Sequence, residues 1–391
     1  MTGQRAIRAG FWASAGWVAH TYAGFPILVA LRGLLRHRPL ASGKSLPSIT
    51  VVVAAYNESA TIIEKLANTL AMEYPPDSLE VIVASDGSED GTNELVAQFG
   101  RGVRLLVLPR LGKNGALTRA AGDANGEILV FTDADTMLTK GTLLHLAVPF
   151  ADPDVGGVAG ERRHGHESKP GRSAADQGKR LLRKLMSRAG NVTSAEGQIY
   201  AVRRELFQPV PENVLDDFWI STRVVAAHRR LVYEPEAASY PLVGATVVRR
   251  PFERKVRMNG PLFRAFWLGR DLFNPAEYGF YSLQLISHKL LRRLLFVPLI
   301  GLAVTAPGLR SRGRVYRAAA LAQGAVHGAA LVGMLLRGTR FGRLPPLRAA
   351  LRFDESNVAA AVALLQQLRG MRPRDDMWEP QRAGLRPGVR G

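Results

Sequence analysis

The chain has 391 residues, of which 47% are hydrophobic and 22% charged, and it contains no cysteine. This length allows two or three domains with a sizeable core, and the lack of cysteine excludes disulfides and thiolate metal sites, leaving oxygen and imidazole ligands for any metal. The 52 Lys and Arg against 33 Asp and Glu give a net charge of +19, which favours anionic partners such as nucleic acid, lipid or polyanionic small molecules.

The first apolar run, residues 11–31, contains no Asp, Glu, Lys or Arg. A helix needs about 20 such residues to span a bilayer, and Trp12 and Trp17 are typical of interface anchors. We therefore predict a transmembrane helix within an N-terminal segment 1–44, with a cleaved signal peptide as the alternative. Basic residues are denser after the run than before it, which predicts that the following domain faces the cytoplasm.

Strand and helix patterns alternate after this segment. Repeated strand–helix units predict an α/β fold with a mostly parallel, doubly wound sheet. Ligands bind to such sheets outside the carboxyl ends of the strands. The predicted strands lie within 48–56, 79–92, 103–109 and 127–135, and the predicted helices are 59–72, 92–100 and 114–124.

Charged side chains stand at all four strand ends. They are Glu58, Asp86, Lys113, and the pair Asp133 and Asp135 in "FTDAD". A single acid in such a place more often caps a helix, but four loops at one edge favour a site. The D-x-D pair suits a hard divalent ion, Mg²⁺ or Mn²⁺, that shares a diphosphate, and Lys113 at a helix N-terminus would balance phosphate charge. Neither a dinucleotide-binding fingerprint nor a P-loop motif occurs.

Four segments in order, "VVVAAYNE", "VIVASDGSEDGT", "GKNGALTRA" and "FTDAD", resemble the nucleotide-sugar half of family 2 inverting glycosyltransferases. Two later segments, 194–207 and 215–237, resemble the acceptor half. The resemblance covers about 48–270 and implies the GT-A fold with a mixed sheet, flanked here by transmembrane helices as in membrane-bound bacterial members. The implied cytosolic domain is 45–285, divided into a nucleotide-sugar half (45–150), an acceptor half (151–250) and interfacial helices (251–285).

The resemblance also implies roles for the strand-end residues. Asp86 would bind the base of the donor, expected to be uracil, with Tyr56 and Glu58 lining the same pocket. Asp133 and Asp135 would form the metal-binding D-x-D, with Asp135 as the expected direct ligand of Mg²⁺ or Mn²⁺.

The motif "LDDF" supplies the candidate base. The resemblance implies that Asp217 is the general base and Asp216 its neighbour. Inverting transfer independently requires a group opposite the leaving diphosphate that takes the proton of the acceptor hydroxyl, and adjacent acids push their pKa values apart. Without the resemblance, two acids at a solvated helix N-terminus would be the simpler interpretation.

The segment "ERKVRMNG" (253–260) departs from the family pattern. Processive members carry Q-x-x-R-W, whereas here Arg254 stands near the Gln position, Arg257 at the Arg and Met258 at the Trp. The two arginines would clamp the diphosphate or acceptor end. An amphipathic interfacial helix over 257–267 is an equal alternative. The missing aromatic platform argues against long processive synthesis.

The C-terminal part, 286–370, carries three further apolar runs. We expect transmembrane or interfacial helices near 294–309, 318–336 and 355–368, followed by a basic tail at 371–391. Four arginines within 310–317 conflict with a simple crossing by the first run.

The basic residues cluster at the edges of apolar runs, which is typical of juxtamembrane segments, and the basic helix or sheet of nucleic-acid binders does not occur. We therefore predict an inverting glycosyltransferase on the cytoplasmic face of the inner membrane, with several spans. It would transfer a sugar from a nucleotide-diphosphate donor, expected to be UDP-linked, to a lipid-linked or polysaccharide acceptor. The alternatives are a catalytically degenerate scaffold or partner of a polysaccharide synthase, and a polyanion-binding surface protein.

Overall fold

The structure is a computed structural model that describes residues 2–36, 38–41, 43, 46–100, 102–163, 173–242 and 251–371. These residues form two compact units. Of the described residues, we call those within 29–242 and 264–282 the sheet unit, and those within 2–28, 251–263 and 283–371 the helical unit. The expected basic tail lies outside the described residues except for Met371.

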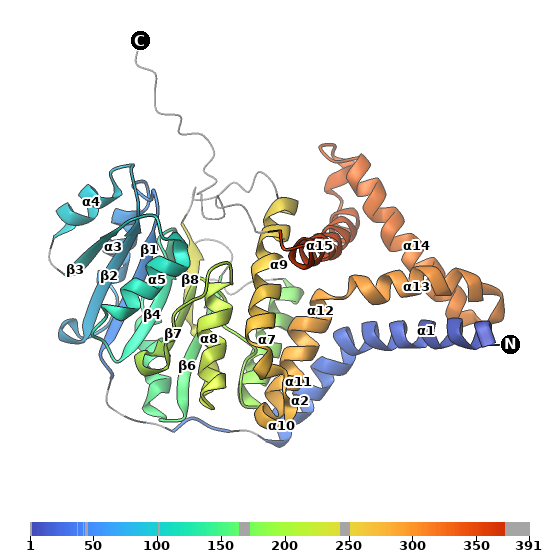
Figure 1. Cartoon of the computed structure of the whole chain (residues 1–391), viewed down its shortest axis with the longest axis horizontal. Coiled ribbons are helices and arrows are strands. Elements are labelled where there is room, and N and C mark those ends of the chain that lie inside the picture. Colours follow the sequence, from blue (N-terminus) through green and yellow to red (C-terminus); the bar gives the residue numbers. More distant parts are fainter. Residues whose placement is uncertain are drawn as a thin grey trace, which may run out of the picture. The chain divides into compact units, whose positions relative to one another are not determined.

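An eight-stranded mixed sheet organises the sheet unit, in the order β3-β2-β1-β4-β7-β6-β8-β5 (Figure 1). β3, β2, β1 and β4 are parallel, and β7 runs antiparallel between β4 and β6. The predicted α/β sheet is therefore confirmed, and it is mixed. The strands are β1 Ile49–Ala55, β2 Leu79–Asp86, β3 Val103–Leu108, β4 Ile128–Asp133, β5 Thr136–Leu138, β6 Val155–Arg162, β7 Ile199–Arg203 and β8 Arg230–Pro241.

The central strands are buried on both faces. Every residue of β1, whose sequence is "ITVVVAA", is buried, as expected for a continuous apolar strand that helices cover on both sides. Helices between the strands provide this cover. They are α3 Ile62–Leu70, α4 Thr92–Phe99, α5 Gly112–Gly122, α6 Thr142–Ala147, α7 Ala174–Arg188 and α8 Asp216–Ala226. Short 3-10 turns follow at 76–78, 148–151, 204–206 and 270–273.

The first of these helices begins later than its periodicity predicts. The pattern predicts a start at residue 59, but α3 begins at Ile62. The backbone N–H of Ser59 donates to Asp90 Oδ2 at 2.9 Å, and Asn57 adopts a left-handed φ of 53°. These contacts join the loop after β1 to the loop after β2, so the strand-end loop is longer than the pattern suggests.

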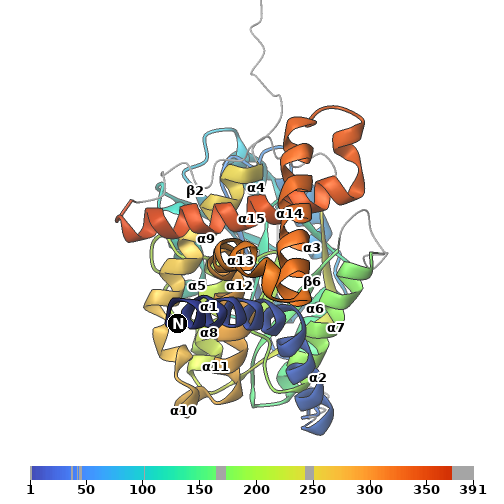
Figure 2. The same cartoon turned by 90° about the vertical axis from the view of Figure 1, so that its right-hand side faces the viewer.

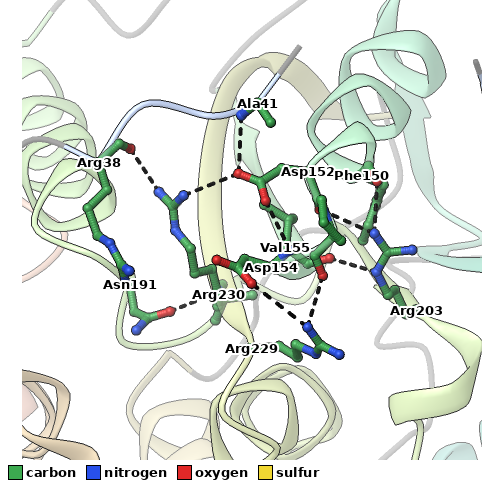
Figure 3. Close-up of polar contacts among 12 residues, drawn as sticks. Arg38, Ala41, Phe150, Asp152, Asp154, Val155, Asn191, Arg203, Arg229 and Arg230 are labelled. Carbon is green, nitrogen blue, oxygen red and sulfur yellow. Dashed lines mark hydrogen bonds and ion pairs between the residues drawn. The ribbon is translucent and has the colours of Figure 1, made fainter. Parts of the chain in front are cut away.

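A cluster of charged residues anchors the chain that leads into the sheet (Figure 3). Asp152 accepts a hydrogen bond from the backbone N–H of Ala41 at 3.2 Å and pairs with Arg230 Nη1 at 3.5 Å. Arg230 also donates to the carbonyl oxygen of Arg38 at 3.0 Å. Arg230 begins β8, which runs parallel to β6. The cluster therefore lies at the edge of the sheet opposite the carboxyl end of β4.

The remaining helices lie in the helical unit or cross between it and the sheet unit, except α10, which lies wholly in the sheet unit. α1 packs along α13 (Figures 1 and 2), so closely that a Cβ on Gly301 would clash with Ser14 Oγ. The helices are α1 Thr2–Ala19, α2 Phe25–Leu35, α9 Pro251–Leu268, α10 Pro275–Tyr278, α11 Phe280–Gln284, α12 Leu291–Arg293, α13 Phe296–Leu309, α14 Arg314–Leu335 and α15 Pro345–Leu368. Wide π-helical turns connect α1 to α2 and α11 to α12, and 3-10 turns lie at 310–312 and 341–343.

Two helices in the described part of the chain are long and apolar enough to cross a membrane, Gly3–Leu35 and Arg314–Leu335. A third candidate is the pair Phe280–Arg293 and Phe296–Arg312, which is bent by 60°. Apolar helices at both ends of the chain are thus confirmed. The expected run at 294–309 lies in the bent pair, and the run at 355–368 lies in α15, which is not among the candidates.

Candidate active site at the strand ends

The D-x-D motif forms the turn between two strands. β4 ends at Asp133 and β5 begins at Thr136, so Asp135 lies in the turn. Asp133 pairs in register with Ala54 near the end of the parallel strand β1. The two acids therefore lie at the carboxyl edge of the sheet, where ligands of doubly wound folds bind.

Lys113 connects this turn to the second acidic motif. Its Nζ lies 2.9 Å from Asp133 Oδ1 and 3.1 Å from Asp216 Oδ2. Burial lowers the pKa of Lys113, but the charges of Asp133 and Asp216 outweigh burial and raise this pKa above its ordinary value. The lysine therefore stays charged at physiological pH. It bonds both Asp133 and Asp216, which are 83 positions apart (216 − 133) and belong to the predicted donor and acceptor halves.

The two acids of the turn are the candidates for holding a divalent cation. Burial raises the pKa of Asp135, and the charge of Asp133 raises it further. Among the described residues, no group of three or more His, Asp or Glu side chains could hold an ion. Two carboxylates on one turn fit a hard ion that takes its other ligands from a bound phosphate and water. The residues present thus fit Mg²⁺ or Mn²⁺ bound together with a diphosphate.

Asp216 and Asp217 are the first two residues of α8. Asp217 Oδ1 accepts a hydrogen bond from the backbone N–H of Phe218 at 2.7 Å, and the helix N-terminus favours its negative charge. A Cβ on Gly197 would lie 3.3 Å from Asp217 Oδ2. The loop before β7, part of the predicted acceptor half, therefore packs directly against the candidate base.

At the end of β2, Asp86 is completely buried and both of its oxygens are bonded. Oδ2 pairs with Arg110 Nη1 at 2.6 Å, and Oδ1 accepts the backbone N–H of Leu111 at 2.5 Å. The Arg110 guanidinium carbon lies 3.4 Å from the ring centroid of Tyr56. The structure thus brings Tyr56 and Asp86 together as predicted, through an arginine that the sequence analysis did not single out. The sequence signal for Arg110 is its position two residues after the end of β3, at the same edge of the sheet.

Glu58 lies in the neighbouring loop. Its carboxylate accepts a hydrogen bond from Thr61 Oγ1 at 2.6 Å, and its backbone N–H donates to Thr92 Oγ1 at 2.9 Å. Its carboxylate therefore caps the turn that leads into α3.

Arg254 and Arg257 belong to the part of α9 that lies in the helical unit. Arg254 is exposed and Arg257 is half-buried. Their role at the diphosphate or acceptor stays a prediction.

The chain is similar in sequence and in fold to known glycosyltransferases and polysaccharide synthases. Residues 50–210 match the family model described as Glycosyl transferase family 2. A poly-beta-1,6-N-acetyl-D-glucosamine synthase of Staphylococcus aureus is 27% identical over 229 residues, which are 56% of this chain and 55% of that protein. The chain thus spans about half the length of these curated relatives. A beta-monoglucosyldiacylglycerol synthase of Trichormus variabilis is 35% identical over 129 residues, 32% of this chain and 28% of that protein.

A solved mannosyltransferase of Pyrobaculum calidifontis, in complex with GDP-Man and Mn²⁺, matches with a TM-score of 0.69 at 24% identity. The match covers 93% of this chain and 100% of that chain. At this identity the likeness shows the fold. The GT-A arrangement that the resemblance implied is confirmed.

Proposed function

We propose that this chain, whose residues 50–210 belong to glycosyl transferase family 2, is an inverting glycosyltransferase that uses a nucleotide-diphosphate sugar. One observation carries the proposal: Lys113 bonds to Asp133 of the D-x-D turn and to Asp216 beside the candidate base. A site with a diphosphate-binding turn and a carboxylate base in one cluster is suited to displacing a diphosphate from a sugar.

Each part of the site has a role in the proposed reaction. Asp133 and Asp135 would hold Mg²⁺ or Mn²⁺, which when bound neutralises charge on the leaving diphosphate. Lys113 offers a second positive charge to the same phosphates. Asp217 takes the proton of the acceptor hydroxyl. The oxygen of that hydroxyl attacks the anomeric carbon of the donor sugar from the face opposite the diphosphate. The bond between the anomeric carbon and the phosphate oxygen breaks as the new glycosidic bond forms, so the configuration of the anomeric carbon inverts.

The donor's base is assigned to the loops after β1 and β2. We propose that Tyr56 lines the pocket of the base, expected to be uracil, and that the buried Asp86 shapes this pocket through Arg110 and the backbone of Leu111, to which its oxygens bond. Arg110 orients the Asp86 carboxylate, because their bond is short and fully enclosed on the aspartate side.

A membrane-bound, carbohydrate-bearing acceptor is proposed on two grounds. The described residues include two candidate spans, and the relatives are named for making a polysaccharide and a glycolipid. We therefore infer a lipid-linked or polysaccharide acceptor at the cytoplasmic face of the inner membrane. The excess of 19 positive charges is suited to that face, which carries anionic lipid.

A hydrolysis and transfer screen tests the proposal. Detergent-purified protein is supplied with UDP- and GDP-sugars and Mn²⁺, and release of the nucleotide is measured. We expect turnover of at least one donor, and a loss of about 10²- to 10⁴-fold in Asp217→Asn, the usual contribution of a general base. Asp154→Asn is the matched control, since Asp154 lies at the opposite edge of the sheet with Arg229 (Figure 3). Full turnover in Asp217→Asn would refute the base assignment.

A degenerate scaffold is the rival function, favoured by Met258 in place of the aromatic residue of processive enzymes. The two functions differ in donor binding. A scaffold predicts no binding of UDP with Mn²⁺ at millimolar ligand and no effect of Asp135→Asn on binding. The enzyme predicts binding that Asp135→Asn weakens.

A further inference from the structure

A lysine occupies the buried face of α3, where an apolar residue is expected. Lys65 is completely buried, and its Nζ donates to Thr132 Oγ1 at 2.9 Å and to the carbonyl oxygen of Thr136 at 2.6 Å. Enclosing an ammonium group is costly unless it is hydrogen-bonded and its charge is balanced. These two partners stand directly before and directly after the acids Asp133 and Asp135.

A second polar side chain follows one helical turn later. Asn68 donates from Nδ2 to the carbonyl oxygen of Leu138 at 3.0 Å and accepts the backbone N–H of Leu138 at Oδ1 at 2.8 Å. Residues three apart lie on the same face of a helix. The K-x-x-N motif of α3 therefore bonds the Thr132 side chain before the D-x-D turn and the backbone of Thr136 and Leu138 after it.

The helix holds the turn from the face opposite the candidate site. Side chains alternate along a strand, so Thr132, which contacts α3, points away from Asp133, which contacts Lys113. The pKa of Lys65 is lowered to about 7, because burial lowers it by more than the charges of Asp133 and Asp135 raise it. Its two hydrogen-bond partners are the residues next to Asp133 and Asp135, so its charge lies near theirs.

We propose that Lys65 is a positioning residue that fixes the D-x-D turn in the geometry for binding a divalent cation, with Asn68 as its partner. The inference rests on the proposed function, because it assigns that cation to the donor's diphosphate. If Lys65 acted only through its charge, its removal would have the opposite effect on cation binding. Removing a positive charge near two carboxylates would strengthen their affinity for a cation.

Binding of Mn²⁺ in the presence of saturating UDP tests this without turnover. Free Mn²⁺ is followed by its paramagnetic resonance signal in detergent-purified protein. We expect Lys65→Met to weaken Mn²⁺ binding about 10- to 100-fold, the usual effect of removing a group that orients metal ligands. Arg230→Met is the matched control, because Arg230 is also a buried cation that bonds a backbone carbonyl, at the opposite edge of the sheet. It should leave Mn²⁺ binding unchanged.

A second pair of variants serves if Lys65→Met does not fold. Thr132→Val removes one acceptor of the lysine at nearly constant shape, and Thr132→Ser keeps it. We expect weaker Mn²⁺ binding in the valine variant alone. The positioning role alone is overturned if the wild type binds Mn²⁺ with UDP and both Lys65→Met and Thr132→Val bind Mn²⁺ equally well or more tightly. A wild type that binds no Mn²⁺ with UDP overturns the proposed function and this inference together.

Discussion

Two acids on one short turn define the candidate site at the scale of single residues. Asp133 and Asp135 are held close together, and Lys113 balances Asp133 directly, while burial and the charge of Asp133 raise the pKa of Asp135. The site therefore stores electrostatic repulsion that a bound cation would relieve. Such stored repulsion is expected to cost folding stability when the cation is absent.

Asp135→Asn should therefore stabilise the metal-free protein at neutral pH. The pKa of Asp135 is higher in the folded protein than in the unfolded chain. Protonated Asp135 therefore favours folding at pH values below the unfolded pKa, and this contribution to stability is lost as the pH rises through the folded pKa. At pH 7 the ionised side chain opposes folding, and the asparagine removes this cost. We expect a Tm higher by about 2–4 °C in the presence of EDTA, the shift that about 1 kcal/mol produces in a domain of this size.

Thermal unfolding in detergent at pH 7.5 and pH 5 measures the effect. The gain should shrink at the lower pH, where more of the wild-type carboxyl is protonated. Mn²⁺ with UDP should stabilise the wild type but not the variant. A lower Tm for Asp135→Asn at pH 7.5 in EDTA would contradict the assigned repulsion.

At the scale of elements, the loop before β7 is held against the first turn of α8. Gly197 leaves little room there, since a Cβ would lie 3.3 Å from Asp217 Oδ2. Contacts of this length are tight enough that the carboxylate must move by a few tenths of an ångström to accept a methyl group. Gly197 therefore limits the positions that the Asp217 carboxylate can occupy.

Gly197→Ala should lower kcat by about tenfold while Tm changes little, because small displacements of a catalytic group already cost up to about 10²-fold. Gly178→Ala is the matched control, because Gly178 lies inside α7 and a Cβ there would have no heavy atom within 4 Å. It should leave kcat unchanged and raise Tm slightly, because alanine favours the helix by about 0.5–1 kcal/mol. Equal kcat in both variants would show that Gly197 does not position Asp217.

At the scale of the whole molecule, apolar helices at both ends of the chain accompany the sheet unit. Gly3–Leu35 and Arg314–Leu335 are each long enough to span the hydrocarbon core. The basic residues that follow the first helix predict a sheet unit on the cytoplasmic side.

The natural lack of cysteine allows a direct test of this topology. Gln98→Cys places a thiol on the exposed side of α4 in the sheet unit, and Gly3→Cys places one at the start of the first span. With a membrane-impermeant maleimide, we expect Gln98→Cys to react in inverted membrane vesicles and not in right-side-out ones. Gly3→Cys should show the reverse. Labelling of Gln98→Cys in sealed right-side-out vesicles would place the sheet unit outside the cytoplasm.

Much of the fold and part of the candidate site could be predicted from the order of residues. Apolar runs of strand length followed by polar turns identified β1 to β4, and because parallel strands end at one edge, the acids after them could be assigned to one site. Boundaries were less predictable. The start of α3 moved to Ile62 because the hydrogen bond from Ser59 to Asp90 depends on a loop about 30 residues away.

The sequence by itself determined the α/β class, the apolar end helices and the D-x-D turn, because each depends on periodicity or on residues close together in the chain. Only the tertiary structure decided that Lys113 bonds both acidic motifs, that Arg110 lies between Asp86 and Tyr56, and that Lys65 holds the turn from behind. These contacts depend on burial and on partners that are distant in the chain. A local pattern carries no information about which charged side chain will be enclosed, or about the oxygen it will meet.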